Sequence, residues 1–182
     1  MHRSRVMLLC SALLAGVTIA APAAPATADE FNGCNSVSGC LPDNFDHTYC
    51  WGSSFTASDL RSAANYGMGN LDSQTSYFDT FIGTCGSVTD LIWHTMSSST
   101  TRGDYLCLAK NSANECEQAR VRLNPTLLTN TLNREKTACH EIGHSGGLAH
   151  SDTASDCMVN GAVTSGHRTY NDHHRAHLNN RS

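Results

Sequence analysis

The sequence of 182 residues is poor in proline and has no excess of basic residues. Its 4 prolines form no proline-rich linker, and it contains neither an internal repeat nor glycine-rich calcium repeats. The 12 Lys and Arg residues are outnumbered by 16 Asp and Glu, so the basic patch of a nucleic-acid-binding protein is not expected. No apolar run reaches the roughly 20 residues of a membrane-spanning helix. We therefore expect one domain without nucleic-acid or membrane partners.

Residues 1–28 have the features of a secretory signal peptide. A short basic start with Arg3 and Arg5 precedes an apolar run of about 15 residues, and Ala26-Thr27-Ala28 matches a small-x-small cleavage site. Cleavage there would leave residues 29–182 with 10 basic and 16 acidic side chains. This pattern predicts a secreted, extracellular protein.

Cysteine is abundant, with nine residues in the sequence. One of them, Cys10, falls within the expected signal peptide. An even number of cysteines in an exported chain indicates disulfide bonds. The eight that remain are Cys34, Cys40, Cys50, Cys85, Cys107, Cys116, Cys139 and Cys157.

Hydrophobic patterning predicts alternating strands and helices. A helix is expected after the capping-box pattern at 56–59, with Leu60, Ala63, Ala64, Gly67 and Leu71 on one face. A second should start near Asn130 or Thr131 and bury Leu132, Cys139 and Ile142, and a third should cover 171–179, capped by Asn171. Strands are expected at 47–55, 77–82, 89–96, 105–109 and 119–123. This order indicates an α/β (α+β) fold with a mixed sheet.

The segment His140–His150 reads H-E-x-x-H-x-x-G-x-x-H. On a helix, His140 and His144 lie on one face and can share one metal ion. Gly147 permits a sharp exit from the helix, after which His150 can return as a third ligand. Three protein ligands leave one position open on a tetrahedral zinc ion, which is typical of a catalytic site.

This motif, followed by Cys157-Met158-Val159-Asn160-Gly161, resembles the zinc site and Met-turn of the metzincin clan of zinc endopeptidases. The resemblance implies a metzincin-like zincin fold: a mixed twisted sheet, two long helices and a small C-terminal subdomain, stapled by disulfides. It divides the catalytic domain 29–182 into an upper part, 29–147, and a lower part, 148–182. The size is similar to that of compact secreted bacterial members such as snapalysin, which differ in having aspartate as third ligand.

The resemblance also implies roles for single residues. One catalytic Zn²⁺ would be held by His140, His144 and His150, and Glu141 would be the general base acting on the zinc-bound water. Met158 would pack under the histidines. Eight cysteines allow 105 connectivities, and among them a Cys139–Cys157 disulfide is our choice, because Cys139 precedes His140 and Cys157 precedes Met158, so that the bond would tie the helix to the Met-turn. Protein or peptide substrates would lie extended along a sheet edge, for which residues 105–109 are our choice. A monomer is expected, and the sequence leaves calcium binding open.

Several alternatives remain at this point. The chain could be a non-catalytic, disulfide-rich zinc-binding module, although such a module would have no need of Glu141. It could also hydrolyse a non-peptide amide. Met158 could be an ordinary core methionine. A second metal site and a solvated terminal helix are two interpretations of His167, His173, His174 and His177, of which His173 and His177 are four residues apart. Cys40 could block the zinc ion as a thiolate or form a disulfide.

Overall fold

A computed structural model describes residues 34, 40–151, 156–161 and 167–180. The expected signal peptide, 1–28, lies outside these residues. Helices in the described chain are α1 (Ser58–Gln74), α2 (Thr131–Ser145) and α3 (Asp172–Asn179). Strands are β1 (Asp46–Trp51), β2 (Phe78–Phe81), β3 (Leu91–Thr95), β4 (Gly103–Lys110) and β5 (Cys116–Leu123). Each predicted helix and strand is thus present, with ends shifted by a few residues.

The strands form one mixed sheet in the order β2-β1-β3-β5-β4. The pairs β1–β2, β1–β3 and β3–β5 are parallel, whereas β4 is antiparallel to β5. The predicted α/β class with a mixed sheet is therefore confirmed. Strand β4 is an outer strand, as expected for the segment 105–109.

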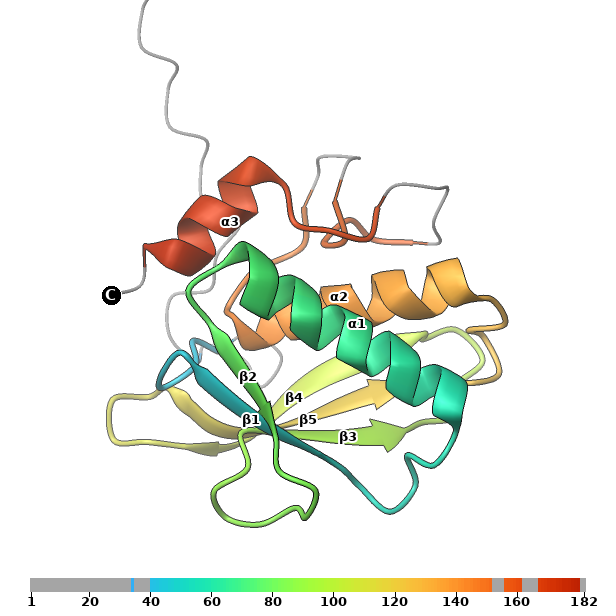
Figure 1. The fold of residues 1–182 in the computed structure, drawn as a ribbon, viewed down its shortest axis with the longest axis horizontal. Coiled ribbons are helices and arrows are strands. Elements are labelled where there is room, and N and C mark those ends of the chain that lie inside the picture. Colours follow the sequence, from blue (N-terminus) through green and yellow to red (C-terminus); the bar gives the residue numbers. More distant parts are fainter. Residues whose placement is uncertain (1–33, 35–39, 152–155, 162–166, 181–182) are drawn as a thin grey trace, which may run out of the picture.

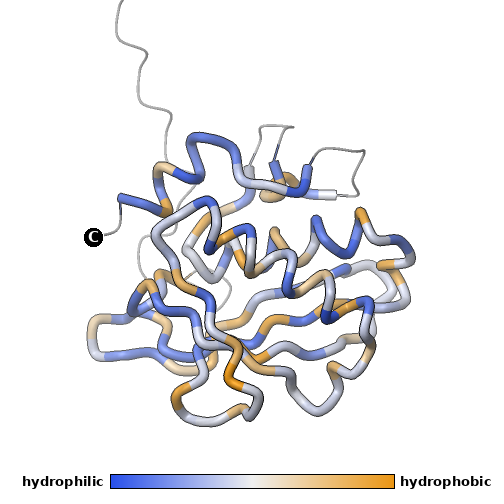
Figure 2. Tube along the Cα trace, in the orientation of Figure 1, coloured by the Kyte–Doolittle hydropathy of each residue, from blue (hydrophilic) through white to orange (hydrophobic). Residues whose placement is uncertain are grey.

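Helices α1 and α2 lie side by side on one face of the sheet, and the chain that carries α3 lies beyond them (Figure 1). The core between helices and sheet contains the fully buried Trp93, Val121 and Ile142. Hydrophobic residues recur along the strands, whereas α3 is mostly hydrophilic (Figure 2). Helix α2 is thus covered both by the sheet and by the C-terminal segment.

Helix α1 buries the five residues that its periodicity predicted: Leu60, Ala63, Ala64, Gly67 and Leu71. The predicted capping box is wrong. The N-cap is Ala57, no side chain caps the helix, and Asp59 instead accepts a hydrogen bond from the backbone N–H of Leu60. An acidic residue in the first turn still favours the helix, because it faces the positive end of the helix dipole.

Helix α2 starts as predicted, with Asn130 as N-cap. The Asn130 side chain accepts a hydrogen bond of 2.9 Å from the backbone N–H of Asn133, which is the usual capping contact. Cys139 and Ile142 are buried as expected, but Leu132 is 39 % exposed. It lies in the first turn, ahead of the stretch 136–145 in which every residue is buried.

Disulfides join Cys34–Cys40, Cys50–Cys85, Cys107–Cys116 and Cys139–Cys157. The expected bond between Cys139 on α2 and Cys157 next to Met158 is confirmed. Cys40 is bonded to Cys34, so its sulfur is not a thiolate ligand. Several disulfides fit an extracellular protein, and no described helix has both the length and the apolar character to cross a membrane.

The contact between α1 and α2 yields a prediction. A Cβ atom on Gly67 would come within 2.8 Å of the Ala138 backbone, whereas a Cβ on Gly69 meets no atom within 4 Å. We expect Gly67→Ala to lower the free energy of unfolding by about 1–3 kcal/mol through overpacking. The matched control Gly69→Ala should raise it by up to about 1 kcal/mol through helix propensity. Urea unfolding measures both, and equal effects would contradict the close contact.

Candidate metal centre

Three histidines converge at the end of α2. His140 and His144 lie on the helix, and His150 lies in the segment that follows it. Their ligand atoms are all within 4.8 Å of one another, so the group could hold a metal ion. His140 and His144 are buried, each 7 % exposed, whereas His150 is on the surface. The structure therefore brings together the three ligands predicted from the sequence.

Backbone carbonyls orient the two helical imidazoles. Nδ1 of His140 is 2.8 Å from the carbonyl oxygen of Cys157, and Nδ1 of His144 is 2.7 Å from that of Leu148. A carbonyl oxygen only accepts hydrogen bonds, so each Nδ1 carries the proton and donates it. The lone pair of each ring is then on Nε2, the arrangement found in histidines that bind metals.

The two Nε2 atoms lie 3.2 Å apart and point toward each other. Two lone pairs at this distance repel, and a cation between them removes the repulsion. Two nitrogens bound at about 2.0–2.1 Å to a tetrahedral zinc stand roughly 3.3 Å apart. The spacing in this protein therefore fits a metal ion of that size.

Burial keeps His140 and His144 in the neutral form that binds metals. Desolvation lowers the pKa of His140 well below its ordinary value and that of His144 to about 4. The pKa of His150, which is more exposed, is also lowered, first by partial desolvation and then by the charge of Lys136. Protonation therefore competes with metal binding only below neutral pH.

The exit from α2 creates both the second carbonyl contact and the third ligand. Gly147 has φ of 83°, a left-handed conformation that favours glycine. The turn is closed by hydrogen bonds from Gly147 N–H to His144 O, 3.0 Å, and from Leu148 N–H to Gly143 O, 2.9 Å. His150 follows, and the side-chain amide of Asn160 lies 3.1 Å from its Nδ1. The predicted role of Gly147 is confirmed.

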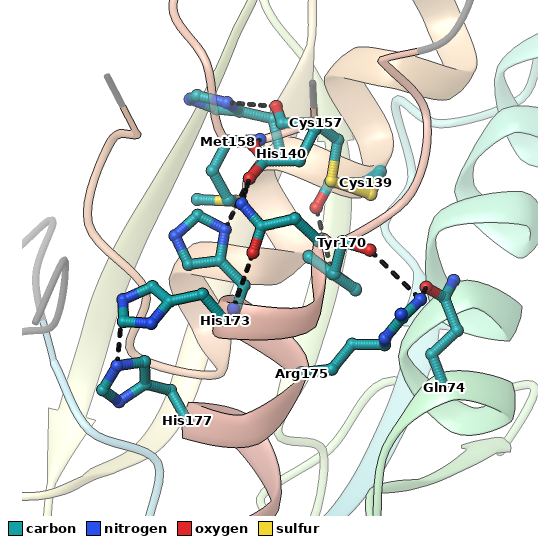
Figure 3. Close-up of polar contacts among 12 residues, drawn as sticks. Gln74, Cys139, His140, Cys157, Met158, Tyr170, His173, Arg175 and His177 are labelled. Atoms are coloured by element: carbon teal, nitrogen blue, oxygen red, sulfur yellow. Dashed lines mark hydrogen bonds and ion pairs between the residues drawn. A yellow bond between two sulfur atoms is a disulfide. The ribbon is translucent and has the colours of Figure 1, made fainter. Parts of the chain in front are cut away.

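Met158 lies beneath the helix at the middle of the site. It is fully buried, and its sulfur occupies the space next to Gly143, where an added Cβ would be 2.2 Å away. Met158 and the Cys139–Cys157 disulfide lie beside His140 (Figure 3). The thioether thus packs against the backbone of α2 between the two helical histidines, and sequence reasoning had assigned Gly143 no part in this contact.

A buried carboxylate, not predicted from the sequence, supports this turn. Asp156 accepts hydrogen bonds from the Met158 N–H, 2.8 Å, and the Asn171 side chain, and lies 2.8 Å from Nδ1 of His174. Asp156 and His174 are both fully buried. The expectation that α3 is merely solvated is therefore wrong for His174. The Asp-x-Met spacing is a local turn signal that could have revealed Asp156.

Tyr170 is also buried by this packing. Its hydroxyl donates a hydrogen bond of 3.0 Å to the carbonyl of Cys139, and desolvation raises its pKa well above the ordinary value. Tyr170 therefore supports the backbone of α2 and does not line the cleft at the histidines.

Glu141 lies with the three histidines in a cleft of about 390 Å³. The start of β4, including Gly103 and Tyr105, forms another wall of this cleft. Gly103 allows the close approach of Glu141, because a Cβ there would be 2.8 Å from the carboxyl oxygen Oε1. Glu141 is only 5 % exposed. Desolvation raises its pKa to about 8, and the charge of Asp104 acts in the same direction.

Two other groups of possible ligands differ from this site. Cys34, Cys40 and Cys107 lie close together, but all three sulfurs are in disulfides. The Nε2 atoms of His173 and His177 on α3 are 3.1 Å apart, yet no third ligand joins them among the residues described. The three-histidine group is therefore the best-formed candidate.

The chain matches no model of a known protein family and no curated protein.

The arrangement of the histidines predicts one metal site of high affinity. Calorimetric titration of the chelator-treated protein with zinc should show one equivalent of zinc bound per chain. His144→Ala should weaken binding by more than about 100-fold, because loss of an outer-shell partner alone costs about 10–100-fold. The control His177→Gln should leave stoichiometry and affinity unchanged. Retention of tight binding by His144→Ala, or its loss in His177→Gln, would rule out this ligand set.

Proposed function

We propose that the protein is a secreted zinc-dependent endopeptidase of the metzincin type. The observation that carries the proposal is the position of Glu141, a buried carboxyl in the same cleft as three convergent histidines and beside an outer strand. Residues 1–28 would direct export, in keeping with the disulfides of the folded domain.

His140, His144 and His150 would hold the zinc ion. All three donors are nitrogen atoms, a set that suits zinc, and three protein ligands leave a position for substrate. A zinc ion at this position supplies a Lewis acid for the scissile carbonyl and lowers the pKa of water. The carbonyls of Cys157 and Leu148 keep both helical Nε2 atoms available as ligands.

Glu141 would be the general base. Its carboxylate accepts a proton from the attacking water and then delivers it to the leaving amine. A pKa raised to about 8 by burial keeps the carboxyl largely protonated at neutral pH in the metal-free protein. A cation held by the three histidines would favour ionisation of Glu141, so loading of the site would also prepare the base.

Strand β4 would bind the substrate. Strand β4 pairs with β5 along one edge, so the opposite edge of its backbone can pair with an extended peptide. Gly103 and Tyr105 at the start of β4 line the cleft that contains Glu141. A peptide paired with this edge would therefore pass the histidines and the base together.

A purely structural zinc site is the competing function. Such sites are normally closed by four protein ligands, whereas the cleft here has three histidines. A structural site also needs no buried carboxyl beside the metal. Both features favour the peptidase.

The role of Glu141 gives the central prediction. Glu141→Gln should reduce casein or gelatin cleavage by at least about 100-fold, the usual effect of losing a general base, while retaining one zinc. The control Glu117→Gln changes an exposed residue on β5 and should cleave like the parent. Chelator should abolish the parent activity. Chelator-insensitive cleavage, or an active Glu141→Gln variant, would refute the proposal.

The position of Gly103 gives a second prediction. In Gly103→Ala the new methyl group would displace the Glu141 carboxyl and the neighbouring Thr137 side chain. We expect cleavage to fall by about 100-fold, as for a misplacement of about 1 Å, with zinc affinity unchanged. Gly86→Ala is the matched control, since a Cβ at Gly86 meets no atom within 4 Å. Equal rates for the two variants would show that Glu141 does not need this space.

A further inference from the structure

Two basic residues line the cleft. Arg102, just before β4, and Lys136 on α2 line the same cleft as the three histidines and Glu141. We call these two residues the basic wall. Lys136 precedes His140 by four residues, so the two share one face of the helix. The basic wall is therefore part of the surface that a substrate in this cleft would meet.

Lys136 is a buried cation whose hydrogen-bond partners are two backbone carbonyls. It is 4 % exposed, and its ammonium group donates hydrogen bonds to the carbonyl oxygens of Val159 and Gly161. Burial lowers its pKa to about 8, with Glu141 opposing the shift and Arg102 adding to it. An ammonium group has three donors, so one remains after the two carbonyls.

The basic wall also lacks a paired carboxylate. Within the described parts of the chain, Asp104 forms its ion pair with Arg122, and no carboxylate lies within ion-pair distance of Lys136 or Arg102. The buried Nε of Arg102 has no hydrogen-bond partner among these residues. A buried cation beside a half-buried one, neither of them in an ion pair with a described residue, favours an anionic ligand.

The direction of β4 places this wall on one side of the scissile bond. Strand β4 runs from Gly103 to Lys110, and a peptide added antiparallel to it runs toward Arg102. Glu141 marks the reacting carbonyl because it lies against Gly103. We take the substrate to pair antiparallel with β4, the commoner pairing, and the residues that follow the scissile bond then lie toward the basic wall.

We propose that the basic wall selects a carboxylate directly after the scissile bond. The carboxylate comes either from an Asp or Glu side chain or from the free C-terminus of the substrate. The inference rests on the proposed peptidase function and specifies its substrate class. A charge-assisted contact of this kind corresponds to a preference of about 10- to 100-fold in kcat/KM.

Matched peptides test the preference on the zinc-loaded full chain. Cleavage sites in casein, mapped by mass spectrometry, supply a parent peptide, from which forms with Glu, Gln or Leu after the scissile bond are made as C-terminal amides. A second pair ends one residue after that bond, as free acid and as amide. We expect Glu to exceed Gln by at least about tenfold if side chains are selected, and acid to exceed amide if the C-terminus is selected.

Variants separate recognition from folding. Lys136→Met should bring the Glu/Gln ratio toward one, whereas Lys136→Arg should preserve it. If Lys136 only tied down the Val159 and Gly161 carbonyls, all peptides would lose rate equally and the ratio would persist. Arg102→Gln leaves those carbonyl contacts intact and should lower the ratio even if Lys136→Met fails to fold.

The outcomes distinguish the two proposals. A parent protein that cleaves the Glu and Gln peptides equally, and the acid and amide peptides equally, overturns the basic-wall inference but leaves the peptidase intact. A zinc-loaded parent that cleaves none of the peptides and no casein overturns both.

Discussion

The structure depends on two hydrogen bonds from histidine rings to backbone carbonyls. By donating Nδ1–H to Cys157 and Leu148, His140 and His144 direct both Nε2 atoms to one point, 3.2 Å apart. Side chains alone would not hold this arrangement, because the facing lone pairs repel. The carbonyls must therefore be held firmly, and much of the C-terminal chain serves this purpose. The carbonyl of Cys157 is held by the Cys139–Cys157 disulfide and by the turn at Asp156. The carbonyl of Leu148 is positioned by the left-handed Gly147 before it.

The sheet contributes the other half of the site. An antiparallel outer strand begins beside α2, and glycine at its first position lets a buried carboxyl approach the strand backbone. The three histidines, Glu141 and the strand edge thus meet in one cleft although they come from residues about 40 positions apart. The same contact buries Glu141, and this burial raises the pKa of its carboxyl group.

Local signals predicted the elements well and their surroundings less well. The α1 face and the Asn130 and Asn171 caps are confirmed, since they follow from periodicity and capping chemistry. The outer position of residues 105–109 is also confirmed, although the sequence did not show which strand forms the edge. The capping box at 56–59 and the burial of Leu132 are wrong. Both errors concern helix ends, where a shift of one or two residues changes which side chains face the core.

The sequence by itself determined which three histidines converge, because the His140–His150 spacing and the turn at Gly147 are properties of one short segment. It also made the Cys139–Cys157 pairing a reasonable expectation. Only the tertiary structure decided that Gly103 admits Glu141, that His174 is buried with Asp156, and that Arg102 faces the same cleft as Lys136. These are contacts between segments distant in the chain, and their geometry depends on how helices and sheet pack, which no local pattern encodes.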